Sequence, residues 1–151
     1  MLELSLPAFE YKVKKQDGVV FIYDIIRKKY VKLTPEEWVR QHFVHYLICQ
    51  KGFPQALIAL EREIEVYGLK RRFDLVCYDR RGNPYLIVEC KAAGVTLSQT
   101  VFDQVFGYNL ILAAPYVAIT NGIRHFCGHL DSNRQFCFLP EIPEFEDFPA
   151  L

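Results

Sequence analysis

The chain has 151 residues, of which 51% are hydrophobic and 15% aromatic, a composition that excludes disorder and favours one domain with a real core. Its 18 basic and 18 acidic residues cancel, which argues against strong nonspecific attraction to nucleic acid. No apolar run approaches the roughly 18 residues of a membrane-spanning helix, and five scattered cysteines without C-x-x-C spacing predict reduced thiols, so we expect a cytoplasmic protein without a membrane partner.

Strand patterns recur along most of the chain, and two helical patterns interrupt them. The strand candidates, in chain order, are 19–24, 29–33, 57–67, 72–78, 85–91, 116–119 and 123–127. This order implies a mixed sheet with helices packed on its faces, an α/β fold. We divide the single domain into an N-terminal arm and hairpin (1–33), a core (34–130) and an acidic, Pro-rich tail (131–151).

The first helix has clear boundary signals. Thr34 suits the N-cap and Pro35 the first helical position, and Glu37 has the spacing that completes a capping box. The apolar spacing continues to a stop at Lys51 and Gly52. A second helix is predicted from a cap at Ser98, over residues 99 to about 112.

The charges are unevenly spread. The last thirteen residues contain four acidic side chains and no basic one, which leaves 18 basic and 14 acidic residues in the rest of the chain. The basic residues gather at 27–29, 70–72 and 80–81. Such clusters are typical both of solvated turns and of a basic face that binds nucleic acid, and both interpretations stay open.

The central hairpin carries charged residues in an otherwise apolar setting. Residues 79–84 have strong turn chemistry, and the flanking strands 72–78 and 85–91 are rich in β-branched and aromatic residues. Asp74 interrupts the first strand, and Glu89 and Lys91 interrupt the second. Their positions suit either solvent-facing charges or a functional cluster.

A one-residue bulge or offset in this hairpin would bring Asp74 and Glu89 together. Two carboxylates on adjacent strands suit a hard divalent cation such as Mg²⁺, which takes oxygen ligands. Lys91 shares the face of Glu89, because side chains two residues apart in a strand point the same way. It could orient a metal-bound water or offset phosphate charge.

Asp74, fourteen further residues and then Glu89-Cys90-Lys91 resemble the signature of the PD-(D/E)XK nuclease superfamily, with Phe73 where Pro is usual. The phrases LTPEEWVRQ, FDQVFGYN and AITNG extend the resemblance to the N-terminal nuclease domain of type I restriction enzyme R subunits. This resemblance implies a restriction-endonuclease-like core of α-β-β-β-α-β order within residues 34–130.

The resemblance also implies roles for individual residues. Asp74, Glu89 and the backbone carbonyl of Cys90 would hold Mg²⁺ or Mn²⁺, and Lys91 would act on the attacking water. Glu37 has two interpretations: the capping box, or a carboxylate that reaches the metal from the first helix. In the pattern Q-x-x-x-Y, Gln104 and Tyr108 share a helix face and would contact the substrate backbone.

The resulting hypothesis is a Mg²⁺-dependent nuclease that acts on DNA, alone, as a homodimer or with other subunits. The alternative is a module that keeps the fold and binds DNA or protein with weak or absent cleavage. RNA as the substrate stays open. A zinc site is a further option, because His125, Cys127 and His129 alternate along one predicted strand and Cys137 could add a fourth ligand.

Overall fold

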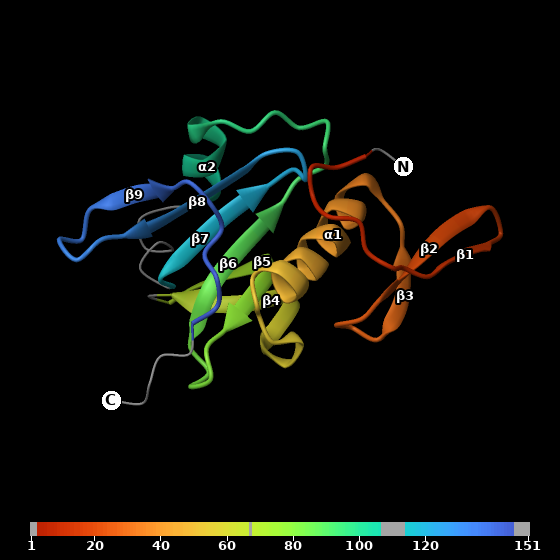
Figure 1. The fold of residues 1–151 in the computed structure, drawn as a ribbon, viewed down its shortest axis with the longest axis horizontal. Coiled ribbons are helices and arrows are strands. Elements are labelled where there is room, and N and C mark those ends of the chain that lie inside the picture. Colours follow the sequence, from red (N-terminus) through yellow and green to blue (C-terminus); the bar gives the residue numbers. More distant parts are fainter. Residues whose placement is uncertain (1–2, 67, 107–113, 147–151) are drawn as a thin grey trace.

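The computed structural model describes residues 3–66, 68–106 and 114–146, and it shows a mixed α/β fold with two sheets (Figure 1). The smaller sheet has three antiparallel strands, β1 (Val13–Gln16), β2 (Val19–Asp24) and β3 (Lys29–Lys32). It lies beyond α1 at one end of the molecule (Figure 1). The predicted N-terminal hairpin is therefore a three-stranded sheet, because residues 13–16, predicted as part of the arm, pair with β2 as an additional strand.

The larger sheet has six strands, which lie in the order of the chain. They are β4 (Ile58–Val66), β5 (Leu69–Tyr78), β6 (Pro84–Cys90), β7 (Tyr116–Thr120), β8 (His125–Leu130) and β9 (Phe136–Leu139). Every neighbouring pair is antiparallel except β6 and β7, which are parallel. The link between these two carries α2 (Gln99–Val105), as a parallel crossover requires. The predicted mixed sheet is confirmed.

Helix α1 (Pro35–Gln50) begins and ends where the sequence predicted. The Thr34 hydroxyl accepts a hydrogen bond from the Glu37 amide at 3.0 Å, and Pro35 lies in the first turn. At the other end Gly52 takes a φ of +74°, which glycine adopts without a steric cost. A single turn of 3-10 helix, Gln55–Leu57, then leads into β4.

The six-stranded sheet is covered on both faces, and each face has its own buried cluster. Phe43 and Leu47 of α1 pack with Val88 in one cluster, whereas Phe102 of α2 packs with Ile87 in the other. Because Ile87 and Val88 are adjacent on β6, alternation sends one to each face. The strand is therefore buried on both sides, as its continuous apolar sequence predicts.

Helix α2 is shorter than predicted. The Ser98 side chain caps it by accepting from the Val101 amide at 3.2 Å, which confirms its start. It ends at Val105, because Phe106 has extended backbone and packs its ring against Phe73. The predicted end near residue 112 falls in 107–113, which lie outside the described residues.

The range assigned to the tail contains β9, so the predicted boundary at residue 130 does not coincide with the edge of the sheet. Asp131 organises the β8–β9 turn, since its carboxylate accepts from the amides of Asn133 and Gln135 at 2.9 Å each. Phe136 and Phe138 then pack against Phe102 with ring centroids 5.5 and 5.1 Å away. Aromatic contacts with α2 thus hold this strand in the fold.

Strand β8 begins at His125, two residues later than predicted. The Asn121 side chain accepts from the amides of Ile123 and Arg124 at 2.9 and 2.8 Å, and this local turn delays the strand. Among the described residues, no helix is long and apolar enough to cross a membrane.

Candidate functional site

Asp74 and Glu89 lie side by side where β5 and β6 stop pairing. The register shifts by one residue between the pairs Cys77–Leu86 and Tyr78–Pro84, which is the kind of offset that brings the two carboxylates together. The regular ladder ends at Leu75–Val88, and Asp74 and Glu89 occupy the next step. There the Asp74 carboxylate, through Oδ2, accepts from the Cys90 amide at 2.6 Å. A side chain therefore replaces the backbone pairing at this step.

The two carboxylates of this pair interact directly. Burial, then a hydrogen bond to Asp74 and the negative charge of Asp74, together raise the pKa of Glu89 to about 8. The charges of Lys91 and Arg71 lower this pKa, but they do not offset the increase. Near neutral pH this raised pKa favours the protonated form of Glu89, whose hydrogen bond to Asp74 keeps the two side chains together.

Arg40 of α1 approaches Asp74 from the helix side. Its Nη2 lies 3.1 Å from Asp74 Oδ1, and its Nη1 lies 3.3 Å from Glu37 and 3.5 Å from Glu61. The side chain is only 7% exposed, and its Nε has no hydrogen-bond partner in the described part of the chain. A buried arginine on a carboxylate holds that carboxylate in place, because neither group is solvated well alone.

The structure does not bring Glu37 into the carboxylate pair. Its carboxylate accepts from Arg27 Nη2 at 2.8 Å, Gln41 Nε2 at 3.1 Å and Arg40 Nη1 at 3.3 Å. Its link to Asp74 runs through Arg40. The reverse half of the predicted capping box is also replaced, since the Glu37 side chain turns to these three donors instead of the Thr34 amide. Its role as a metal ligand stays a prediction.

Two carboxylates near Asp74 were not singled out from the sequence. Burial and then the charge of Asp74 raise the pKa of Glu36, while Arg40 and Lys91 lower it, so Glu36 faces the site from α1. The i, i+4 spacing of Glu36 and Arg40 was an available signal. Glu61 falls opposite Asp74 in the β4–β5 register. Its φ of 51° could not be predicted from the sequence pattern.

Lys91 follows β6 at the predicted place. Its amide donates to the Thr120 carbonyl at 2.8 Å, which fixes the backbone beside β7. The half-buried ammonium lies close enough to act on both Glu36 and Glu89, whose pKa values its charge lowers. Arg71, also missed from the sequence, has its Nη2 3.8 Å from Glu89 Oε2. The site is thus a carboxylate pair with cationic groups on several sides.

The structure describes only one of the two predicted substrate-binding residues, Gln104. Gln104 is exposed on α2, where it is available to a ligand in solvent. Tyr108 falls outside the described residues, so the spatial relation of the two is not fixed.

The donor set suits a hard cation. Two adjacent carboxylates repel each other when both are charged, and a divalent ion with oxygen ligands removes that repulsion. Cys90 adds a backbone carbonyl as a third oxygen at the same strand end. Among the described residues, no group of three or more His, Cys, Asp or Glu side chains has the arrangement of a metal site. The fit therefore rests on two side chains and the backbone.

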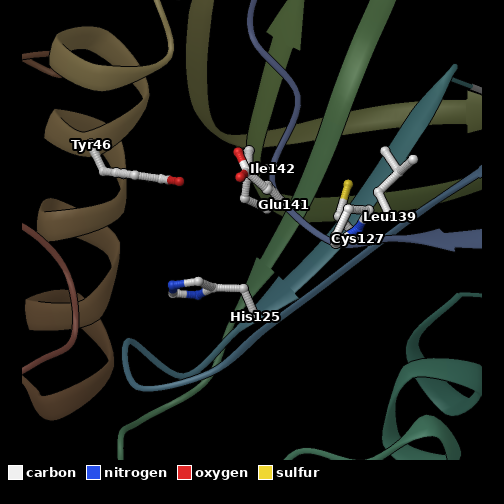
Figure 2. A pocket seen from close by; sticks show the side chains of 7 residues that line it. Tyr46, His125, Cys127, Leu139, Glu141 and Ile142 are labelled. Carbon is white, nitrogen blue, oxygen red and sulfur yellow. The ribbon is translucent and has the colours of Figure 1, made fainter.

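The predicted zinc ligands do not assemble into such a group. His125 and Cys127 line a cavity of about 350 Å³ between α1 and residues 139–142, and Tyr46 faces it from the helix (Figure 2). His125 Nδ1 instead lies 2.6 Å from the Thr120 hydroxyl. His129 and Cys137 form a separate pair, in which His129 Nε2 lies 3.3 Å from Cys137 Sγ. The cavity contains no member of the carboxylate pair.

A mixed sheet with helices on both faces, and a carboxylate pair followed by a lysine at a central strand end, define a restriction-endonuclease-like α/β domain. The family comparison is specific: the chain belongs to the family described as the type I restriction enzyme R protein N terminus, whose model matches residues 35–143. That family links the chain to restriction–modification and to DNA-directed, multi-subunit enzymes. No curated protein and no solved structure shows a match.

Proposed function

We propose that the chain is a PD-(D/E)XK nuclease that hydrolyses phosphodiester bonds of DNA with Mg²⁺ or Mn²⁺. The observation that carries this proposal is the contact between the Asp74 and Glu89 carboxylates at the open end of the β5–β6 ladder. Family membership supports the nuclease context, and the spacing of Asp74, Glu89 and Lys91 supports the particular signature.

Asp74, Glu89 and the Cys90 carbonyl would hold the cation. When bound, such an ion supplies positive charge to the phosphate oxygens and lowers the pKa of a coordinated water. Lys91 would orient that water and offset the charge that develops on phosphorus-bound oxygen. Arg40 keeps Asp74 directed at the site, and Glu37 keeps Arg40 in place, because their oxygens and nitrogens are already paired.

The remaining assignments follow the same proposal. Glu36 is the α1 carboxylate with an electrostatic effect from Asp74, so it is better placed than Glu37 to extend the metal site. Gln104 and Tyr108 would position the DNA strand. Phosphate contacts carry no base sequence, so we propose that cleavage specificity comes from partner subunits or a second copy of the chain.

Incubation of the purified protein with plasmid and with single-stranded DNA, in Mg²⁺ or Mn²⁺, tests the proposal. We expect cleavage that Asp74→Asn and Lys91→Met each reduce by at least about 100-fold, as removal of an electrostatic stabiliser does. Asp103→Asn is the matched control, since Asp103 is an exposed carboxylate on α2. Equal cleavage by all four proteins would reveal a contaminating nuclease and refute the assignment.

A binding module is the second candidate, and one observation favours it: arginines already neutralise Asp74, Glu37 and Glu61 without a metal. In that case the protein binds DNA in both the presence and absence of Mg²⁺, with no cut product in either. An RNA substrate in the same assay separates deoxyribonuclease from ribonuclease activity.

A further inference from the structure

The outward face of the small sheet gathers lysines and aromatic rings. Strand register places Lys14, Phe21 and Lys32 in one row across the three strands. Tyr23 and Tyr30 are paired in the neighbouring row, and the Tyr23 amide bonds to the Lys12 carbonyl. Side chains in adjacent rows two residues apart share a face. The outward face therefore consists of Lys12, Lys14, Phe21, Tyr23, Tyr30 and Lys32.

The other face of this sheet is the one that packs on the domain. Ile22 is fully buried in the α1 cluster, and Val31 packs against that cluster. Asp24, also on that side, is 1% exposed and paired with Arg27. The lysines and rings are therefore turned away from the core, and the sheet stands beyond α1 at the end of the molecule (Figure 1).

Side-chain contacts within the face are those of a cationic aromatic surface. Lys14 Nζ lies 4.4 Å from the centre of the Tyr30 ring, a cation–π contact. Tyr23 and Tyr30 have ring centroids 5.3 Å apart. All three lysines are exposed, and the rings are half-buried, so both charge and ring edges are accessible from solvent.

The charge of this region contrasts with that of the whole chain. Residues 11–33 contain seven basic and two acidic residues, although the whole chain has no net charge. One of the acids, Asp24, is neutralised on the core side, and the other, Asp17, lies in the β1–β2 turn. The face itself has no carboxylate. A positive face with interleaved rings is the combination that binds the backbone and bases of single-stranded nucleic acid.

We propose that this lysine–aromatic face binds a single-stranded segment of nucleic acid, with phosphates at Lys12, Lys14 and Lys32 and bases against the tyrosine rings. The family model begins at residue 35, so it does not cover this sheet. The face is separate from the carboxylate pair, and the binding needs no metal.

A continuous chain of ion pairs fixes the position of this sheet relative to the candidate site. Arg27 joins Asp24 of β2 to Glu37 at 2.5 and 2.8 Å, and Arg40 joins Glu37 to Asp74 at 3.3 and 3.1 Å. A nucleic-acid strand bound to the lysine–aromatic face therefore lies at a defined distance from Asp74. This consequence for cleavage rests on the proposed nuclease function, whereas binding to the face does not.

The test is a salt titration of binding to a fluorescein-labelled oligothymidylate in EDTA, where cleavage plays no part. We compare the wild-type chain with the triple variant Lys12→Gln, Lys14→Gln, Lys32→Gln. A control triple variant, Lys15→Gln, Lys29→Gln, Lys70→Gln, has the same change in charge at exposed positions off this face. The logarithm of the binding constant falls as the logarithm of the salt concentration rises. The loss of three phosphate contacts should make this dependence shallower by about 2 in the Lys12, Lys14, Lys32 variant and leave it unchanged in the control.

The ring contribution is tested separately with Tyr30→Leu, whose fold is checked by its melting curve. We expect about tenfold weaker binding to the oligothymidylate and loss of 2-aminopurine quenching in a labelled strand. The proposal is overturned if both triple variants lose affinity equally, or if duplex DNA of equal length or polyglutamate competes as well as the single strand. Intact binding with no cleavage in Mg²⁺ would refute the nuclease proposal and leave this one standing.

Discussion

The two carboxylates of the candidate pair have opposite surroundings. Asp74 is held by a buried arginine at 3.1 Å and by the Cys90 amide at 2.6 Å. Glu89 has the charges of Lys91 and of Arg71, whose Nη2 lies 3.8 Å from Glu89 Oε2, and burial nevertheless raises the pKa of Glu89. The difference teaches that one half of the pair is fixed by its ion pair and hydrogen bond, while the other half is the one whose charge the proposed cation would change.

Removal of Arg40 should give the largest change. In Arg40→Met the buried carboxylate of Glu37 and the half-buried carboxylate of Asp74 lose their shared cation, and we expect about 3–5 kcal/mol less free energy of unfolding. Urea denaturation measures this loss. Lys70→Met is the control, because Lys70 is exposed at the β4–β5 hairpin and should change stability by under about 0.5 kcal/mol. Equal effects of the two would show that Asp74 does not depend on the arginine.

Addition of a cation should act on the Glu89 half. At Mn²⁺ concentrations about 100 times the dissociation constant, binding to the folded state alone adds about 2.7 kcal/mol to the free energy of unfolding. Glu89→Gln and Asp74→Asn should abolish this increase, and removal of the ion with EDTA should reverse it. The measurement is the denaturation midpoint with and without Mn²⁺. A full increase in Glu89→Gln would place the ion elsewhere.

The pH dependence of stability should separate the two carboxylates further. The pKa of Glu89 is raised from 4.5 to about 8 on folding, so the folded state holds the proton more tightly. Its stabilising contribution is complete below about pH 4.5 and is lost as pH rises through about 8. Relative to Glu89→Gln, the wild-type chain should therefore lose about 2 kcal/mol between pH 6 and 8. Parallel curves for the two proteins would contradict the raised pKa.

The smallest expected effect concerns Glu61, on the arginine side. Its φ of 51° lies in the left-handed region, which costs a residue with a side chain about 1 kcal/mol more than glycine. Both Glu61→Gly and Glu61→Ala lose the contact to Arg40, so their difference isolates the backbone. We expect the glycine variant to be more stable by about 1 kcal/mol in urea denaturation. Greater stability of the alanine variant would remove the strain argument.

The sequence identified the hairpin and its charged residues because the signals there are local. Turn residues at 79–84 and an apolar run interrupted by Asp74 and Glu89 were enough to predict the two strands and to show that a one-residue offset would bring the two carboxylates together. The cap of α1 was likewise local, since Thr34 bonds three residues away. Interactions between residues so close in the chain can be predicted from the sequence without knowledge of the fold.

The electrostatic surroundings of the pair could not be read in the same way. Arg40 meets Asp74 across 34 positions of the chain, and Glu61 reaches the arginines after a backbone kink that its residue type does not favour. Glu37 was assigned to the metal by resemblance, whereas Arg27, ten positions away, competes for it. Strand β9 likewise belongs to the sheet because its phenylalanines pack against Phe102 of α2. These features depend on tertiary packing.

The register shift between Cys77 and Tyr78 separates the β5–β6 turn from the carboxylate pair. Asp79 closes that turn internally by accepting from the Arg81 and Asn83 amides at 2.9 Å each. The ladder from Leu75 to Cys77 lies between the turn and Asp74. Extra residues inserted after Arg81 should therefore leave the spacing of the two acids intact, which makes this loop a suitable attachment point for a reporter group or an affinity handle.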